Sequence, residues 1–193
     1  MSLTDFNNLI ESAISGDRQA FATIYSEYYV KIYNYILRHI WNVELAQDVT
    51  SEVFLSLLMN IHKYKFNDEN HFKNFLYKIA TNEINEFVRT KKTRKTFLES
   101  ECEQILKAQV PSEELEEADK VMQSSSEYAV VYKHLVTLKP MYQNIIQLKI
   151  YEDKTYEDIS EITGMSVNTL KSHFSRAIKQ LQEKMQPNIV INH

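Results

Sequence analysis

The sequence predicts an all-α protein made of two small helical domains joined by an acidic linker. Only two glycines and three prolines occur among 193 residues. These turn-forming residues are too few for many β-turns or Gly-rich loops, but their number is ordinary for a chain of long helices. Apolar residues recur at steps of three and four through long stretches of the chain, as they do in amphipathic helices. With 44% hydrophobic residues, the chain has enough apolar material to fold around a core.

The first predicted domain, residues 1–95, contains four helices. A short pattern over residues 5–15 runs into Gly16, and Asp17 is placed to cap a second helix. The apolar face of that second helix consists of Phe21, Ile24, Tyr25, Tyr28, Ile32, Ile36, Leu37 and Ile40. A third helix, at about residues 44–64, is expected to turn inward Leu45, Val49, Val53, Leu57, Leu58 and Ile61.

A polar loop, residues 65–71, is expected to separate the third helix from a long fourth one. The fourth helix is predicted from Phe72 to about Lys95. Its buried side should contain Leu76, Ile79, Ala80, Ile84, Phe87 and Val88.

Charge separates the linker from the two domains. Residues 1–95 carry 12 Lys/Arg against 11 Asp/Glu, residues 96–127 carry 2 against 9, and residues 128–193 carry 8 against 6. The middle segment has little sustained periodicity and is interpreted as the linker. The net charge of -4 therefore comes from the linker, and it does not exclude nucleic-acid binding by the domains.

The second predicted domain contains four helices, at residues 128–138, 141–151, 156–162 and 167–185. Its most specific motif, residues 155–170, has the form helix, tight turn, helix. Thr155 and Asp158 have the spacing of a capping box, and Gly164 stands where the turn needs a positive φ. Small Ser160 permits a close helix crossing, and the residues expected between the helices are Ile159, Met165 and Leu170.

The second helix of this motif should present a polar and basic outer face. Hydroxyl, amide and basic side chains at the start of such a helix can reach phosphates and base edges in the DNA major groove. The alternative is an ordinary solvated helical hairpin. The candidate DNA-binding residues are Ser166, Asn168, Thr169, Lys171, Ser172, Ser175 and Arg176.

The third helix carries a second candidate surface, on the side opposite its core stripe. Asp48, Ser51, Glu52 and Leu55 share one face by their spacing, and this face could dock a basic partner helix. The alternative is an ordinary solvated face.

The long fourth helix carries a third candidate surface. Aromatic, amide and basic side chains in one stripe suit single-stranded DNA, because bases stack on aromatic rings while cations follow the phosphates. Alternatively, Phe75 belongs to the core and the basic residues near Lys95 form a solvated helix end. The candidates are Phe66 in the preceding loop and then Phe75, Lys78, Asn82, Asn85, Arg89 and Lys92.

In this order, the elements resemble the extracytoplasmic-function (ECF) group of the sigma-70 family over nearly the whole chain. Residues 45–55 look like the family's polymerase-clamp-binding helix. Residues 72–89 resemble the segment that melts and reads the minus-ten element, and residues 138–181 are similar to the minus-thirty-five-binding domain. Many relatives have Trp, Ala and Gly where this chain has Phe75, Ser160 and Asn168, which bears on promoter sequence more than on function.

The resemblance implies an alternative sigma factor that binds promoter DNA and the clamp and flap of core RNA polymerase, with no cofactor and no catalysis of its own. It assigns the third-helix face to the polymerase, the fourth-helix stripe with Phe66 to the minus-ten element, and the outer face of the motif to the minus-thirty-five element. It also implies an anti-sigma factor as a partner, which could be anchored in the membrane.

Two other functions compete with this one. A stand-alone helix-turn-helix regulator would use the first domain for sensing or dimerisation. A metal hydrolase is disfavoured because the six histidines show no ligand spacing such as H-E-x-x-H. A single cysteine, no signal-peptide pattern and no long apolar stretch lead us to expect a cytoplasmic protein that does not enter the membrane.

Overall fold

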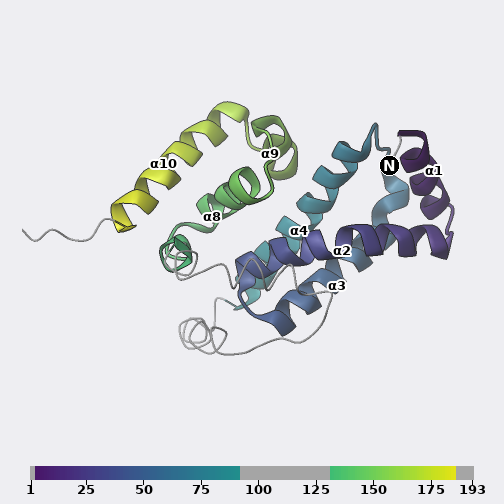
Figure 1. The fold of residues 1–193 in the computed structure, drawn as a ribbon, viewed down its shortest axis with the longest axis horizontal. Coiled ribbons are helices and arrows are strands. Elements are labelled where there is room, and N and C mark those ends of the chain that lie inside the picture. The colour runs from purple at the N-terminus through teal and green to yellow at the C-terminus, as the bar shows by residue number, and fades with distance from the viewer. Residues whose placement is uncertain (1–2, 92–130, 186–193) are drawn as a thin grey trace, which may run out of the picture. The chain divides into compact units, whose positions relative to one another are not determined.

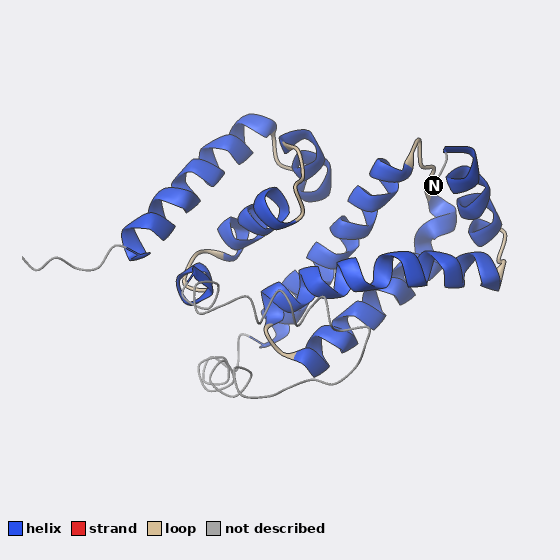
Figure 2. Cartoon of the chain, in the orientation of Figure 1, coloured by secondary structure: helices blue, strands red, loops and turns tan. Residues whose placement is uncertain are grey.

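The structure, a computed structural model, describes residues 3–91 and 131–185, and all regular secondary structure in these ranges is helical (Figures 1 and 2). The described helices divide into an N-terminal and a C-terminal unit. The predicted all-α fold is confirmed. The predicted linker, residues 96–127, and the candidate residue Lys92 lie outside the described residues.

The N-terminal unit contains four α-helices: α1 (Leu3–Ile14), α2 (Arg18–Ile40), α3 (Val43–Asn60) and α4 (Glu69–Lys91). A 3₁₀ turn, Ile61–Lys63, follows α3. Helices α2, α3 and α4 pack against one another, and α1 packs on α2 (Figure 1). The residues in their shared core include Ile24, Tyr28, Ile32, Tyr35, Ile36, Val53, Leu57, Phe72, Leu76 and Ala80.

Short polar links define the helix ends in this unit. Gly16 takes a φ of 90°, and the Asp17 carboxylate accepts the backbone N–H of Gln19 at 2.8 Å, so α1 ends and α2 begins as predicted. Trp41 takes the left-handed conformation after α2, and the Asn42 side chain then caps α3. Two residues therefore suffice to turn the chain from α2 into α3.

Three sequence-based predictions for this unit are wrong in detail. The loop before α4 ends at Asp68, because the Asp68 carboxylate accepts the backbone N–H of His71 at 2.8 Å and so begins the helix earlier. Leu58 was expected inside but is 48% exposed, since Leu57 takes the buried position and neighbouring helical residues point in different directions. Tyr25, on the edge of the α2 stripe, is likewise exposed.

The C-terminal unit contains a helical segment at residues 131–135 and three longer helices. These are α8 (Pro140–Ile146), α9 (Tyr156–Thr163) and α10 (Val167–Met185), and they match the predicted helices closely. A π-helical turn, Gln147–Tyr151, extends α8. The core of the unit includes Leu135, Leu138, Tyr142, Ile145, Leu148, Ile159, Ile162, Leu170, Ala177 and Leu181.

Candidate functional site

The candidate face of α3 is open to solvent. Asp48, Ser51, Glu52 and Leu55 are all exposed, while the opposite side of the helix is buried. The Ser51 hydroxyl donates to the Gln47 carbonyl at 3.0 Å, so it already has a partner in its own helix. We call these four residues the docking face, in which two carboxylates and one leucine are available to a partner.

The apolar part of this surface is larger than the sequence suggested. Leu55 is 50%, Leu58 48% and Met59 63% exposed, and all three project from the C-terminal half of α3. Large apolar side chains in such a group commonly mark a binding surface. Sequence analysis missed Leu58 and Met59 because the apolar spacing could not show which residues at the edge of the stripe were covered.

A carboxylate from α4 adds to the acidity of the docking face. Partial burial, and after it the charges of Glu52 and Glu86, raise the pKa of the Glu83 carboxyl. Glu83 and Glu52 therefore lie near each other although they belong to different helices. An acidic surface beside exposed apolar groups suits a basic amphipathic helix.

Phe75 belongs to an aromatic cluster at the start of α4. Its ring centroid lies 4.2 Å from that of Tyr64 and 5.3 Å from that of Phe66, while Phe66 packs edge-on against fully buried Phe72. Phe75 itself is half-buried, and Tyr64 is 47% exposed. Phe75 thus contributes to packing and still keeps an accessible surface, and Tyr64 is an aromatic candidate that sequence analysis missed.

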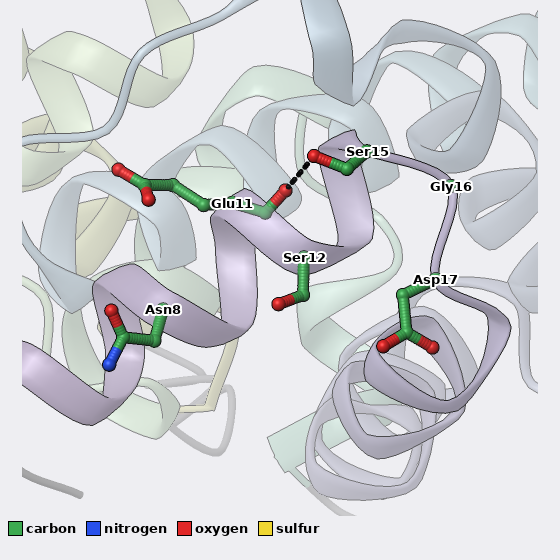
Figure 3. Close-up of a pocket in the computed structure, with 6 residues that line it drawn as sticks. All are labelled: Asn8, Glu11, Ser12, Ser15, Gly16 and Asp17. Carbon is green, nitrogen blue, oxygen red and sulfur yellow. Dashed lines mark hydrogen bonds between the residues drawn. The ribbon is translucent and has the colours of Figure 1, made fainter.

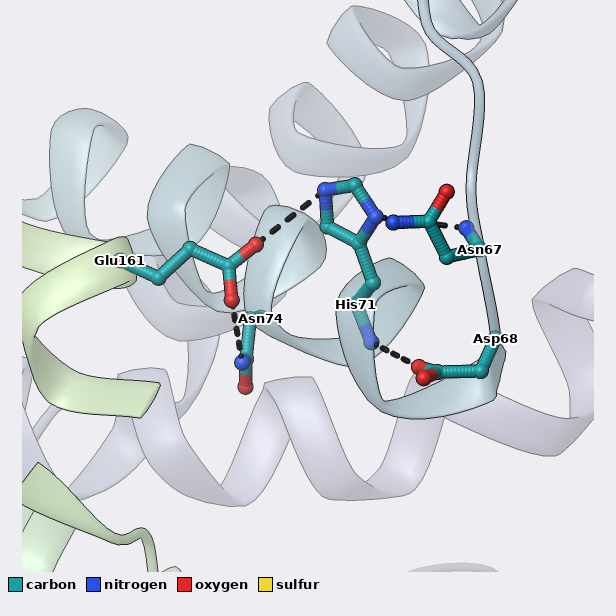
Figure 4. Close-up of polar contacts among 5 residues, drawn as sticks. All are labelled: Asn67, Asp68, His71, Asn74 and Glu161. Carbon is teal, nitrogen blue, oxygen red and sulfur yellow. Dashed lines mark hydrogen bonds and ion pairs between the residues drawn. The ribbon is translucent and has the colours of Figure 1, made fainter. Parts of the chain in front are cut away.

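The turn before α4, whose polar contacts Figure 4 shows, holds this cluster in place. The backbone N–H of Asn67 donates to Nδ1 of His71 at 3.3 Å, and Asp68 caps the helix. The His71 ring packs against Phe66 at a centroid distance of 5.7 Å. Phe66 is therefore fixed near Phe75 by the first turn of α4.

The remaining described residues of the α4 stripe lie on the surface. Lys78, Asn82, Asn85 and Arg89 are exposed, as predicted. Arg89 forms a bidentate ion pair with Glu86, with Nη2 at 2.6 and 2.7 Å from the two carboxylate oxygens. This hydrogen bonding raises the pKa of the Arg89 guanidinium, which remains a cation.

Helices α9 and α10 form the predicted helix-turn-helix. Thr155 and Asp158 make a complete capping box, and Gly164 ends α9 with a φ of 75°. The Ser160 hydroxyl donates to the Met165 carbonyl at 2.6 Å across the turn. The Ser166 hydroxyl accepts the backbone N–H of Thr169 at 3.2 Å and so caps α10.

The outer side of α10 has the predicted composition. We call it the recognition face, and its exposed residues are Ser166, Asn168, Thr169, Lys171, Ser172, Ser175 and Arg176. The hydroxyls of Ser166 and Thr169 lie 2.8 Å apart and share a hydrogen bond. The other side of the helix buries Leu170, Ala177 and Leu181, so the recognition face can meet a duplex while the helix stays packed.

Other parts of the described chain offer weaker sites. A recess at the α1–α2 turn is lined by Asn8, Glu11, Ser12, Ser15, Gly16 and Asp17 (Figure 3). The Ser15 hydroxyl donates to the Glu11 carbonyl and Asp17 caps α2, so two of these side chains serve helix ends. In residues 3–91 and 131–185 no group of three or more His, Cys, Asp or Glu side chains could hold a metal ion. No helix in these ranges has both the length and the apolar character needed to span a bilayer.

Two family models match the chain. "Sigma-70 region 2" matches residues 24–94, which include most of α2 and all of α3 and α4. "Sigma-70, region 4" matches residues 130–181, which include α8, α9 and most of α10. Together the matches span well over half of the sequence. The chain belongs to the sigma-70 family. The docking face, the α4 stripe and the recognition face all lie within the matched residues.

Similar proteins place this sigma factor in the ECF group. It is 28% identical to the ECF RNA polymerase sigma factor SigW of Bacillus subtilis over 92% of this chain and 95% of the relative. It is 27% identical to the ECF RNA polymerase sigma-E factor of Haemophilus influenzae, over 96% and 97%. The chain is therefore an alternative sigma factor, and the stand-alone regulator is not favoured.

Solved structures share its fold. CnrH, solved in complex with the cytosolic domain of CnrY, has a TM-score of 0.66 at 16% identity, covering 93% of this chain and 96% of that one. The sigma factor RpoE of Bartonella quintana, solved with the anti-sigma factor NepR, has a TM-score of 0.62 at 18% identity, covering 87% and 98%.

Proposed function

We propose that this sigma factor joins core RNA polymerase, directs it to its own set of promoters, and traps the opened minus-ten region. One observation carries the proposal: the chain has two different DNA-compatible surfaces, one suited to duplex and one to unpaired bases. A stand-alone regulator needs only the first of them. The protein would need no cofactor, and the proposal includes no enzymatic step.

The docking face is assigned to the polymerase. Asp48 and Glu52 would meet basic residues of the clamp of the largest subunit, and Leu55 would add an apolar contact. Charge complementarity of this kind speeds encounter and suppresses wrong partners. A second contact, between the C-terminal unit and the polymerase flap, would hold that unit over upstream DNA.

The α4 stripe is assigned to the non-template strand of the minus-ten element. Unstacking a base costs a few kcal/mol, and stacking on an aromatic ring returns about 1 to 3 kcal/mol per base. These two free energies nearly cancel. The accessible edge of the aromatic cluster therefore needs to add only a small favourable free energy to make the open state the preferred one. Asn82 and Asn85 can bond base edges, and Lys78, Arg89 and Lys92 would follow the phosphates.

The recognition face is assigned to the major groove of the minus-thirty-five element. Its seven residues combine amide, hydroxyl and basic groups, which read base edges and phosphates. The domain plan completes the proposal, with residues 1–95 for the polymerase and the minus-ten element, an acidic linker at 96–127, and residues 128–193 for the minus-thirty-five element.

The protein is further proposed to work in the cytoplasm under the control of an anti-sigma factor. Support comes from a fold relative, RpoE of Bartonella quintana, that was solved with the anti-sigma factor NepR. The exposed carboxylates and apolar groups of α3 offer a surface that an inhibitor could cover in competition with the polymerase.

Transcription in vitro tests the proposal. Purified core polymerase is incubated with and without the protein on DNA from upstream of its own gene, together with a library of randomised promoters. We expect discrete new transcripts that require both proteins, and their start sites would define the promoter. Tight, sequence-specific DNA binding by the protein alone, without new transcripts, would contradict it.

A further inference from the structure

The α4 stripe contains a cation that is already bound to an anion. Nε of Arg89 lies 3.1 Å from Oε2 of Glu86, and Nη2 lies 2.7 and 2.6 Å from Oε1 and Oε2. Lys78, the other cation of the stripe that the structure describes, forms no ion pair with the described residues. The two cations proposed to follow the DNA phosphates therefore differ before DNA is present.

Glu86 occupies the edge of the Arg89 guanidinium that a phosphate would use. Arginine binds carboxylates and phosphates with the same planar fork of N–H groups. Two atoms of that fork, Nε and Nη2, already donate to the Glu86 carboxylate. A DNA phosphate can bind this edge only after the carboxylate has left it. Both side chains are largely exposed, so the ion pair is weak enough for such an exchange.

Glu86 also ends a series of carboxylates that begins on the docking face. Glu83 lies one helical turn before Glu86 on α4, which packs against α3. Partial burial, and after it the charges of Glu52 and Glu86, raise the pKa of the Glu83 carboxyl, so these three carboxylates lie near one another. We call Glu52, Glu83 and Glu86 the acidic run. It extends from the surface proposed for the polymerase to Arg89.

We propose that Glu86 acts as a built-in substitute for a DNA phosphate, which holds Arg89 in the free protein and releases it when the polymerase binds the acidic run. The inference rests on the proposed function, which places the polymerase on the docking face and DNA on the α4 stripe. Cations of the polymerase that reach Glu52 and Glu83 would repel the Arg89 guanidinium and compete for the Glu86 carboxylate. Charges act over about 8 Å at physiological salt, and one helical turn is about 5.4 Å, so these groups are within range of one another.

This contact would make DNA binding depend on polymerase binding. In the free chain, a phosphate must displace Glu86 from Arg89, which lowers the affinity for DNA. In the holoenzyme, Arg89 is available from the start. The affinity difference between the two states is a coupling between the polymerase site and the DNA site.

Binding to the non-template strand of the minus-ten element measures the contact. The probe is a fluorescently labelled single strand from the promoter identified by transcription, and its anisotropy is followed with the full chain alone and with the holoenzyme. At low salt, Glu86→Gln should raise the affinity of the free chain about two- to fivefold, as expected for the loss of one exposed ion pair. The same substitution should leave the affinity of the holoenzyme nearly unchanged, because Arg89 is already released there.

A double-mutant cycle separates this contact from a general loss of negative charge. The gain from Glu86→Gln should disappear in an Arg89→Gln background, because the guanidinium is then absent. It should persist in a Lys78→Gln background, which removes an unpaired cation from the same stripe. Glu11→Gln removes the same charge from an exposed position of α1 and should bind the strand like the wild type.

The strand should in turn strengthen binding to the core polymerase, because a coupling between two binding equilibria has the same size in both directions. The strand should raise the affinity of the wild type for core enzyme about two- to fivefold more than it raises that of Glu86→Gln. Competition against labelled wild-type protein for limiting core enzyme, with and without the strand, measures this difference.

No gain for Glu86→Gln in the free chain, or an equal gain in the Arg89→Gln background, would overturn the contact. An equal gain in the free chain and in the holoenzyme would overturn its release by the polymerase. Urea unfolding followed by Trp41 fluorescence verifies that the N-terminal unit of each variant is folded. A wild-type chain that never joins the core enzyme would instead overturn the proposed function, and this inference with it.

Discussion

At the scale of single residues, one carboxylate fastens the start of α4 to α2. The Tyr28 hydroxyl donates to Oε1 of Glu69 at 3.0 Å, and the Lys73 ammonium lies 2.6 Å from the same oxygen. The hydrogen bond from Lys73 lowers the pKa of Glu69, and burial followed by the charge of Glu69 raises the pKa of Tyr28. These contacts lie next to the turn that carries Phe66 and so help to position the surface proposed to bind the minus-ten element.

Glu69→Gln should lower the free energy of unfolding of the N-terminal unit by about 1 kcal/mol at pH 7. Because the folded pKa is lowered, the stability from the carboxylate is present above its unfolded value of 4.5 and is lost as pH falls through the folded value. The difference between wild type and variant should therefore close in acid. Urea unfolding followed by Trp41 fluorescence measures this, because Trp41 is the single tryptophan of the chain and lies in this unit.

Glu86→Gln is the control for this measurement, since its ion pair with Arg89 is exposed and should contribute little. Equal losses for both variants would contradict the role of Glu69. If the loss in the free energy of unfolding caused by Glu69→Gln stays constant between pH 7 and strong acid, the ionised Glu69 carboxylate is not its cause.

The sequence predicted the exposure of most candidate site residues correctly, but it did not predict contacts between residues distant in the chain. The seven residues of the recognition face follow from helical period, and the Thr155 and Asp158 cap follows from local spacing. The approach of Glu83 to Glu52, and of Lys149 to Tyr156, depends on how helices pack, which no local pattern records. Half-burial of Phe75 likewise depends on Tyr64 and Phe66 lying over it.

At the scale of helices, the spacing of apolar residues located each helix but did not predict where some of the helices begin or end. The pattern placed the start of α4 at Phe72, the first buried residue. The helix begins one turn earlier, because the Asp68 side chain accepts a hydrogen bond from the backbone N–H of His71. The π-helical turn after α8 also escaped prediction. Apolar spacing reports which residues face the core, and it is insensitive to such backbone hydrogen bonds.

The double variant Asp48→Lys/Glu52→Lys should weaken core-polymerase binding at least tenfold at low salt, because it reverses the charge of the docking face. Leu58→Ser/Met59→Ser should also weaken binding, chiefly by faster dissociation, if the apolar surface of α3 is part of the interface. Competition against labelled wild-type protein for limiting core enzyme measures both effects.

Glu11→Lys/Glu27→Lys makes the same change in net charge on exposed positions of α1 and α2 and should compete like the wild type. If the Asp48 and Glu52 variant competes equally well, the docking assignment is wrong. If only the Leu58 and Met59 variant keeps full binding, the interface is confined to the acidic part of α3.

At the scale of the whole molecule, the chain distributes its charge in a way that suits action within a holoenzyme. Residues 1–95 and 128–193 are close to neutral with local basic clusters, and residues 96–127 carry 9 Asp/Glu against 2 Lys/Arg. A protein of net charge -4 gains little from general attraction to DNA. Promoter choice must then come from specific surfaces that the polymerase presents to the DNA together.

Substitutions in the recognition face and in the α4 stripe should impair different steps of initiation, namely duplex recognition and promoter opening. Arg176→Ala should remove the proposed contact to duplex DNA, which is worth about 1 to 3 kcal/mol if it reads a base. This contact would be needed whether or not the minus-ten region is paired. Phe75→Leu keeps apolar volume in the aromatic cluster but loses the ring, so it should impair opening. Asn82→Ala should impair capture of an unpaired base.

Transcript yield on a matched promoter, and on one already mismatched across the minus-ten region, separates these roles. Pre-opening removes the cost of melting, so Phe75→Leu should recover most of its lost yield, while Arg176→Ala should remain equally defective. Asn82→Ala should stay defective on both templates, because capture is still required after opening. Permanganate reactivity of unpaired thymines reports opening directly. Trp41 fluorescence verifies that the N-terminal unit of the Phe75 and Asn82 variants is folded, and circular dichroism verifies the helix content of Arg176→Ala. If Phe75→Leu loses the same factor on both templates, or nothing on the matched one, Phe75 serves the packing of Tyr64 and Phe66 and the opening of DNA depends on other residues of the α4 stripe.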